Sequence, residues 1–174
     1  MREEQLEKLH EECGVFGIFD KGDLDVSWAT YHGLYALQHR GQESCGIAVN
    51  HGGEINVHKD VGLVNEVFTR EHLVGLGGGQ MAIGHCRYAT TGTRTRSNAQ
   101  PLVTRHIKGT MAIAHNGNLT NAAELRAQSE MTGGIFHTTS DTEVIAYTII
   151  KERLQKPTIE EAITAAMGLS LIHI

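Results

Sequence analysis

The sequence contains little proline and little cysteine. Among 174 residues it has two prolines and three cysteines, with no C-x-x-C pair: Cys13, Cys45 and Cys86. An odd and scattered set of cysteines argues against a disulfide framework or a zinc ribbon and favours a reduced, cytoplasmic protein. Eleven histidines are equally scattered and form no H-E-x-x-H motif, so no bound metal is expected.

Long apolar runs and excess positive charge are also lacking. No apolar run reaches the length of a membrane span, and the first twelve residues are too acidic for a secretory signal. The formal net charge is -5, and basic residues gather only between Arg87 and Lys108. This balance supports neither a nucleic-acid partner nor a membrane partner, and apart from Arg87 these basic residues fit a solvated loop.

The residues that are present indicate one globular domain with mixed secondary structure. Twenty glycines favour tight turns and close backbone approaches. Strands are predicted at 14–19, 80–90 and 109–117, a hairpin from 44–50 and 54–60, and helices at 25–39, 121–131, 140–156 and 158–167. The pair Ser140 and Glu143 predicts a capping box at the start of the third helix. Strands and helices in groups indicate an α+β fold rather than a doubly wound one.

Cys13 stands where an acidic segment meets an apolar strand, in EECGVFGIFD at 11–20. Alone, a Cys-Gly pair fits a small core residue, a redox thiol or a nucleophile. Four further motifs accompany it along the chain: HRGQES at 39–44, GHCRYATTG at 84–92, AHNGNL at 114–119 and SDTEV at 140–144.

In order and spacing, these motifs resemble the class II glutamine amidotransferases, which are N-terminal-nucleophile hydrolases. The resemblance covers residues 13 to about 168. Within the class, LQHRGQES, RYATTG and NAQPL most resemble the amidophosphoribosyltransferase family, and Tyr88 stands where the glucosamine-6-phosphate synthases tend to have a tryptophan. The resemblance implies a four-layer αββα sandwich, with two antiparallel sheets between helical layers, that is C-terminally truncated here.

The resemblance also implies how the chain is divided. Residues 1–12 are expected to be a propeptide, and 13–168 an incomplete glutaminase domain. The terminal segment 169–174 ends within an apolar stretch, and LSLIHI resembles the translated end of a cloning transposon. This segment is therefore expected to be non-native, and the alternative is a native strand cut short.

Removal of residues 1–12 would free the α-amine of Cys13. A thiol with a pKa of about 8.5 and an α-amine with a pKa of about 8 let one residue act as nucleophile and base. The resemblance assigns the oxyanion donors to the side chain of Asn116 and the backbone N–H of Gly117. On its own, Asn-Gly is also the commonest hairpin turn.

Substrate L-glutamine is a zwitterion, so its site needs one cation and one anion. The resemblance places Arg87 on the α-carboxylate, where a planar guanidinium binds bidentately, and Asp141 on the α-ammonium. Without the resemblance, Arg87 fits a surface residue and Asp141 an acid stabilised by a helix dipole. Further pocket residues implied by the resemblance are Thr90, Thr91, Arg40 and Gly41.

The expected reaction is hydrolysis of glutamine to glutamate and ammonia through a Cys13 thioester. The resemblance implies that ammonia then passes to phosphoribosylpyrophosphate in a phosphoribosyltransferase domain absent from this chain. The product would be 5-phosphoribosylamine, in the first committed step of purine (IMP) synthesis. No cofactor is expected in these residues, because the Mg²⁺ and the 4Fe–4S cluster of some relatives belong beyond residue 174. A homo-oligomeric parent is expected.

Two alternatives stay open. The chain fits another class II amidotransferase, such as glucosamine-6-phosphate synthase, or a catalytically silent regulatory domain in which residues 1–12 stay attached and the Cys13 nitrogen stays an amide. In either case Cys45 and Cys86 are expected to be small core residues. The histidines nearest the motifs, His39, His85 and His115, are expected to be structural.

Overall fold

The computed structural model describes residues 13–88, 95–169 and 172–173. Its main sheet is four-stranded and antiparallel, with strand order β1-β4-β2-β3. The predicted hairpin of 44–50 and 54–60 is confirmed as its β2–β3 pair. The strands are β1 (Gly14–Phe19), β2 (Ser44–His51), β3 (Glu54–Val61) and β4 (Met81–Arg87).

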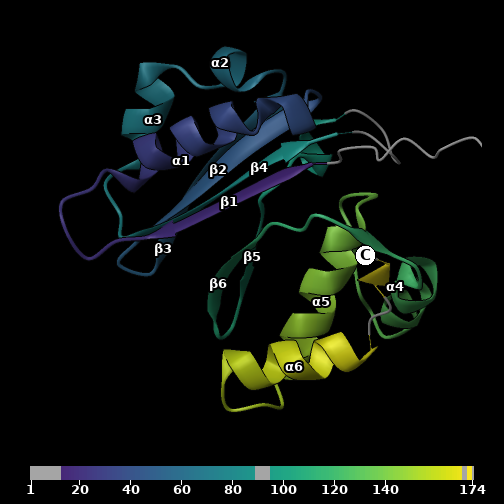
Figure 1. Cartoon of the computed structure of the whole chain (residues 1–174). Coiled ribbons are helices and arrows are strands. Elements are labelled where there is room, and N and C mark those ends of the chain that lie inside the picture. Colours follow the sequence, from purple (N-terminus) through teal and green to yellow (C-terminus); the bar gives the residue numbers. More distant parts are fainter. Residues whose placement is uncertain (1–12, 89–94, 170–171, 174) are drawn as a thin grey trace, which may run out of the picture.

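Helices cover one face of this sheet (Figure 1). Asp25 starts the first helix, because its carboxylate accepts hydrogen bonds from the backbone N–H of Ser27 and of Trp28. Trp28 and Tyr31 of that helix contact each other edge to face, and both pack against the core. The elements on this side are α1 (Val26–Ala36), the 3-10 helix η1 (Gln38–Arg40), α2 (Val64–Val67) and α3 (Arg70–Leu76).

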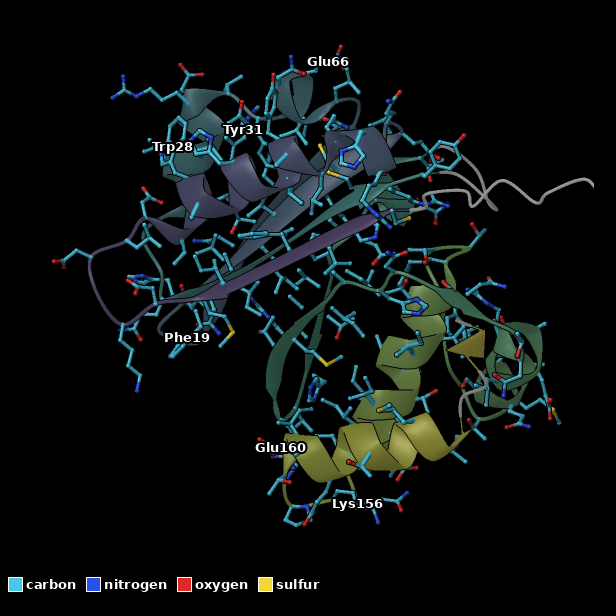
Figure 2. All side chains as sticks on the ribbon, in the orientation of Figure 1. Phe19, Trp28, Tyr31, Glu66, Lys156 and Glu160 are labelled. Atoms are coloured by element: carbon cyan, nitrogen blue, oxygen red, sulfur yellow. The ribbon has the colours of Figure 1, made fainter. Side chains whose placement is uncertain are left out.

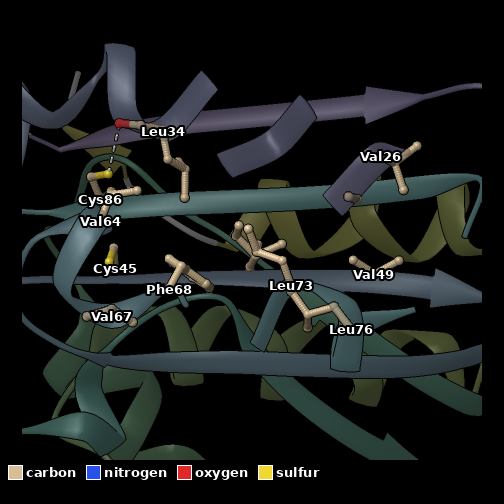
Figure 3. Close-up of a cluster of buried hydrophobic side chains, with 12 residues drawn as sticks. Val26, Leu34, Cys45, Val49, Val64, Val67, Phe68, Leu73, Leu76 and Cys86 are labelled. Carbon is tan, nitrogen blue, oxygen red and sulfur yellow. Dashed lines mark hydrogen bonds between the residues drawn. The ribbon is translucent and has the colours of Figure 1, made fainter. Parts of the chain in front are cut away.

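The hydrophobic core lies between these helices and the sheet (Figure 3). Val26 and Leu34 of α1 are fully buried against it. Cys45 and Cys86 are 1% and 0% exposed, which confirms the prediction that both are core residues. The Cys86 thiol donates to the backbone carbonyl of Leu34 and so faces α1. Complete burial of an aliphatic side chain contributes about 1.5–3 kcal/mol, so this layer fixes the sheet on which the site is built.

The second half of the chain covers the other face of the sheet (Figure 1). A short hairpin lies against the sheet, and two packed helices cover the hairpin. Figure 2 shows side chains from both sides filling the space between the sheet and these helices. The elements are η2 (Arg96–Asn98), β5 (Leu102–His106), β6 (Gly109–Ile113), β7 (Asn118–Leu119), α4 (Ala122–Met131), α5 (Asp141–Arg153), α6 (Ile159–Leu169) and β8 (Ile172–His173).

The predicted α+β class is confirmed, and the layers follow the order helix, sheet, sheet, helix. In the described residues the second sheet consists of the β5–β6 hairpin alone. A separate two-residue pair joins β7 to β8. The predicted strand at 109–117 ends at Ile113, because the backbone of His115 pairs with a side chain rather than with a strand.

The predicted capping box at the start of α5 is half correct. Ser140 is the N-cap and accepts from the backbone N–H of Thr142. Glu143 does not reach back to Ser140. Its carboxylate accepts instead from the backbone N–H groups of His137 and Thr138, where it orders the turn before the helix. No helix in the described part of the chain is long and apolar enough to cross a membrane.

Candidate active site

The strand register brings Cys13 and the end of β4 to one edge of the main sheet. Gly14 pairs with Cys86 in neighbouring antiparallel strands, so the residue before β1 meets the residues that end β4. The backbone N–H of Tyr88 lies 3.4 Å from Sγ of Cys13 and donates to it. Phe19, at the other end of β1, is on the far side of the molecule (Figure 2).

The backbone of Cys13 has an unusual conformation, and its carbonyl oxygen accepts two hydrogen bonds. Its φ is 51°, in the left-handed region that non-glycine residues rarely adopt. Its carbonyl oxygen accepts from Nε of Arg40 at 2.9 Å and from Nδ2 of Asn116 at 3.4 Å. The amide that the sequence predicts as an oxyanion donor therefore lies beside the predicted nucleophile.

Three residues predicted for the site, Arg40, Gly41 and Asn116, are not among those that line the cavity beside Cys13. Arg40 instead holds the Cys13 carbonyl. Gly41 is buried under the end of β4, where a Cβ would lie 2.6 Å from the carbonyl carbon and oxygen of Cys86. Arg40 and Gly41 thus pack behind Cys13 and the end of β4, because only a residue without a side chain fits so close to the strand at position 41.

Arg87 is the last residue of β4 and is buried in an ion pair. Its Nη1 lies 3.1 Å from Oε1 of Glu43, and the two side chains are 10% and 7% exposed. Glu43 directly precedes β2, and its backbone N–H donates to the carbonyl of Arg87. The guanidinium is therefore oriented by a fixed carboxylate.

Asp141 is the first residue of α5, where a helix dipole stabilises a carboxylate. Its Oδ2 accepts from the backbone N–H of Leu119 at 2.9 Å. The same oxygen lies 3.9 Å from Nδ1 of His115. These contacts tie the start of α5 to the segment that carries Asn116 and Gly117.

A cavity of about 340 Å³ joins these elements. Four residues predicted for the site line it, namely Cys13, Arg87, Gly117 and Asp141. A larger open groove of about 720 Å³ lies at the other end of the sheet, but its lining contains no cysteine, arginine or lysine. The smaller cavity is therefore the candidate site, since it alone of the two combines a thiol, a cation and an anion.

Several lining residues were not predicted from the sequence. Gln100 lies in the motif NAQPL and His115 in the motif AHNGNL, so these two motifs indicated that both residues are near the site. Arg126 had no such signal, because a mid-helix arginine normally indicates a solvated face. Its Nη2 donates to the carbonyl of Thr138 at 2.9 Å, before α5. The unpredicted lining residues are Tyr88, Gln100, His115, Asn118, Ala122, Ala123, Arg126, Thr139, Ser140 and Val144. Thr90 and Thr91 lie outside the described residues.

Cys13 is less buried than the other cysteines and than His85, and burial shifts the pKa values of those groups. Burial raises the pKa of the Cys86 thiol to about 12, and the neighbouring Cys13 adds to the shift. Burial likewise raises the pKa of Cys45 far above its ordinary value. Burial lowers the pKa of His85 to about 4, so this imidazole is neutral at physiological pH. Cys13 is only partly buried. The described residues contain no group of three or more His, Cys, Asp or Glu side chains that could hold a metal ion.

Comparison with known proteins agrees with the motifs. Residues 75–156 match the family model described as the glutamine amidotransferase domain. The amidophosphoribosyltransferase of Methanocaldococcus jannaschii is 48% identical over 151 residues, which cover 87% of this chain and 32% of the relative. The matched segment belongs to the glutamine amidotransferase domain family.

Solved structures and further relatives support the same family and its fold. The amidophosphoribosyltransferase of Bacillus subtilis is 49% identical over 83% of this chain and 30% of the relative. A glutamine phosphoribosylpyrophosphate amidotransferase from B. subtilis, solved with ADP and GMP, covers 92% of this chain and 33% of its own, with TM-score 0.77 and 40% identity. A second solved structure, of an allosteric regulatory enzyme of purine biosynthesis, covers 91% of this chain and 33% of its own chain, with TM-score 0.83 and 42% identity. The chain thus spans about a third of the length of these relatives.

Proposed function

We propose that this chain is the glutaminase part of an amidophosphoribosyltransferase. It hydrolyses L-glutamine to glutamate and ammonia, and a phosphoribosyltransferase domain uses the ammonia to convert phosphoribosylpyrophosphate to 5-phosphoribosylamine. The relatives named amidophosphoribosyltransferase, at 48% and 49% identity, support this assignment over other class II amidotransferases. The three free cysteines fit a cytoplasmic location.

The observation that carries the proposal is the lining of the 340 Å³ cavity. Cys13, Arg87, Gly117 and Asp141 come from four separate segments and meet around one space large enough for a small amino acid. A zwitterionic substrate fits between a guanidinium and a carboxylate, with its side chain directed to the thiol. A silent domain has no need to bring these four groups together.

The proposed reaction begins with the thiolate of Cys13. The α-amine of Cys13 takes up the thiol proton, and the resulting thiolate attacks the side-chain amide carbon of glutamine. The amide of Asn116 and the N–H of Gly117 stabilise the tetrahedral oxyanion, and each such donor contributes about 3 kcal/mol. The C–N bond breaks, ammonia leaves with the proton from the amine, and a thioester forms. Water then hydrolyses the thioester to glutamate and the free thiol.

This mechanism requires a free α-amine, so residues 1–12 are proposed to be removed as a propeptide. The left-handed φ of 51° at Cys13 supports this, because such a conformation costs about 1–3 kcal/mol in a non-glycine residue. Cleavage before Cys13 removes the constraint on that φ. The division into a glutaminase domain at 13–168 and a non-native segment at 169–174 remains part of the proposal.

The acceptor half of the reaction lies outside this chain. The proposal therefore assigns phosphoribosylpyrophosphate binding, any Mg²⁺ or 4Fe–4S cluster, and homo-oligomer contacts to the rest of the protein. Within this chain the ligand is glutamine alone.

Intact mass and one substitution test the proposal together. In the whole protein, purified after expression from Met1, we expect a mass that lacks residues 1–12. We expect Cys13→Ala to lose glutamine-dependent activity and to keep ammonia-dependent synthesis. Retention of residues 1–12 in a folded protein would support the silent-domain alternative. Loss of both activities in Cys13→Ala would make Cys13 a structural residue.

A further inference from the structure

Gln100 holds the backbone of His115 with both ends of its side-chain amide. Its Oε1 accepts from the N–H of His115 at 2.7 Å, and its Nε2 donates to the carbonyl of His115 at 3.2 Å. Gln100 is 7% exposed, so water competes little with these bonds. The amide thus takes the place of a partner strand immediately before Asn116 and Gly117.

Asn98 also uses both ends of its side-chain amide, here to hold the backbone N–H and the hydroxyl of Thr139. Its Oδ1 accepts from the N–H of Thr139 at 3.1 Å, and its Nδ2 donates to Oγ1 of Thr139 at 3.0 Å. Asn98 is 2% exposed. Thr139 is two residues before Asp141, so this pair fixes the turn that leads into α5.

The segment 98–100 is itself fixed to the main sheet. Nζ of Lys59, on β3, donates to the carbonyl of Ala99 at 2.5 Å. Gly46, on β2, leaves room for the same segment, because a Cβ there would collide with the carbonyl oxygen of Gln100. The segment therefore joins the sheet that carries Cys13 and Arg87 to the half of the chain that carries the other site residues.

The two amides act on different parts of the cavity. The ring of His115 lies against Gly117, where a Cβ would come within 2.9 Å of Nε2 of His115. Gln100 therefore sets the position of the oxyanion donors. Asn98 acts through Thr139 on the start of α5, and so on the carboxylate of Asp141.

We infer that Gln100 and Asn98 are positioning residues with separate effects, Gln100 on the oxyanion donors and Asn98 on the ammonium-binding carboxylate. The inference rests on the proposed glutaminase function. Oxyanion donors act in the transition state, so their displacement lowers kcat. The ammonium contact is made equally in the ground state and the transition state, so its displacement raises KM.

Near-isosteric apolar variants of the whole protein test this inference through steady-state glutamine hydrolysis. For Gln100→Met we expect kcat to fall about tenfold or more with KM within about threefold, because only transition-state binding is lost. For Asn98→Leu we expect KM to rise about tenfold with kcat within about threefold, because binding common to both states is lost. Gln128→Met and Asn56→Leu repeat these changes at exposed positions and should leave both parameters unchanged.

Two milder variants apply if either buried change prevents folding. Gln100→Glu keeps an acceptor for the His115 N–H but sets a carboxylate oxygen against the His115 carbonyl, so kcat should again fall selectively. Thr139→Val removes only the hydroxyl that Asn98 holds, so KM should again rise selectively. Folding is checked by cooperative urea unfolding of each variant.

The result that overturns the inference is wild-type kinetics in both buried variants, or an equal change of kcat and KM in each. Cys13→Ala measured alongside separates this failure from that of the proposed function. Full glutamine hydrolysis by Cys13→Ala overturns the proposed function and the inference with it. Its loss, combined with wild-type kinetics for Gln100→Met and Asn98→Leu, overturns the inference alone.

Discussion

Nη1 of Arg87 lies 3.1 Å from Oε1 of Glu43, with both side chains at least nine-tenths buried. The planar guanidinium meets the carboxylate in a fixed geometry, so its position depends on Glu43. Glu43 precedes β2 and Arg87 ends β4, so the pair also joins two neighbouring strands at the edge of the sheet. The proposed carboxylate-binding cation is thus oriented by the fold before substrate arrives.

Glu43→Ala should cost stability and substrate affinity together. Removal of one partner of a buried ion pair leaves the other charge uncompensated, which costs about 3–5 kcal/mol. We expect a loss of this size in urea unfolding and a higher KM for glutamine in the fraction that folds. The exposed Glu54→Ala is the matched control, with an expected change within about 0.5 kcal/mol. An equally small change for Glu43→Ala would contradict the assigned role of the pair.

Iodoacetamide should distinguish the three cysteines in the folded protein. The reagent attacks the thiolate, and burial raises the pKa of the Cys86 thiol to about 12 and that of Cys45 further. Cys13 is the only one of the three that is not buried. At pH 7.5, peptide mass spectrometry should find Cys13 alkylated first, and the other two only after urea is added. Early alkylation of Cys86 in folded protein would show that the sheet edge opens.

Gly41→Ala should disturb the packing behind the end of β4, next to the proposed nucleophile Cys13. A Cβ at this position would lie 2.6 Å from the backbone of Cys86, and backbone cannot move aside as a flexible side chain can. We expect a loss of about 1–3 kcal/mol in urea unfolding, as for other overpacked sites. Gly75→Ala, in α3 with no atom within 4 Å of the added carbon, is the control and should be neutral or slightly stabilising.

Local patterns in the sequence predicted the first half of the fold well. The β2–β3 hairpin follows from a strand pattern whose hydrogen-bond partners are close along the chain. The strand after Cys13 follows from its apolar run, although its partner, β4, lies far along the chain. The second sheet was predicted only in part. The strand expected at 109–117 ends at Ile113, because Gln100 takes the pairing position at His115, and its partner β5 was not predicted. A side-chain amide that replaces a strand leaves no periodic signal.

The residues of the candidate site were also predicted only in part. The family resemblance pointed to Cys13, Arg87 and Asp141, all of which line one cavity. The resemblance did not show that Arg40 contacts the Cys13 carbonyl or that Gly41 packs against the backbone of Cys86, since both contacts depend on how close the backbones approach. Asn98, a buried amide that bonds a residue 41 positions away, is likewise visible only in three dimensions.

His85 should make stability depend on pH below neutrality. Burial lowers its pKa to about 4, with the charge of Arg87 and the neighbouring His115 adding to the shift and a backbone contact to His115 opposing it. In the unfolded chain the pKa of histidine is about 6.5. Above that pH the imidazole is neutral in both states and its contribution is fully present. As the pH falls from 6.5 towards 4, the unfolded state binds the proton first, so the free energy of unfolding falls.

His85→Leu tests this dependence because neither ring nitrogen of His85 makes a hydrogen bond in the described structure, so the change removes little else. Wild-type protein should lose about 2 kcal/mol between pH 7 and pH 5 through this one group, and His85→Leu should lose that much less. The pKa of His58 is also lowered by burial, so some slope should remain. His137→Gln, at an exposed position, is the control and should keep the wild-type slope in urea unfolding at the two pH values. An unchanged slope in His85→Leu would mean that its imidazole accepts a proton inside the fold.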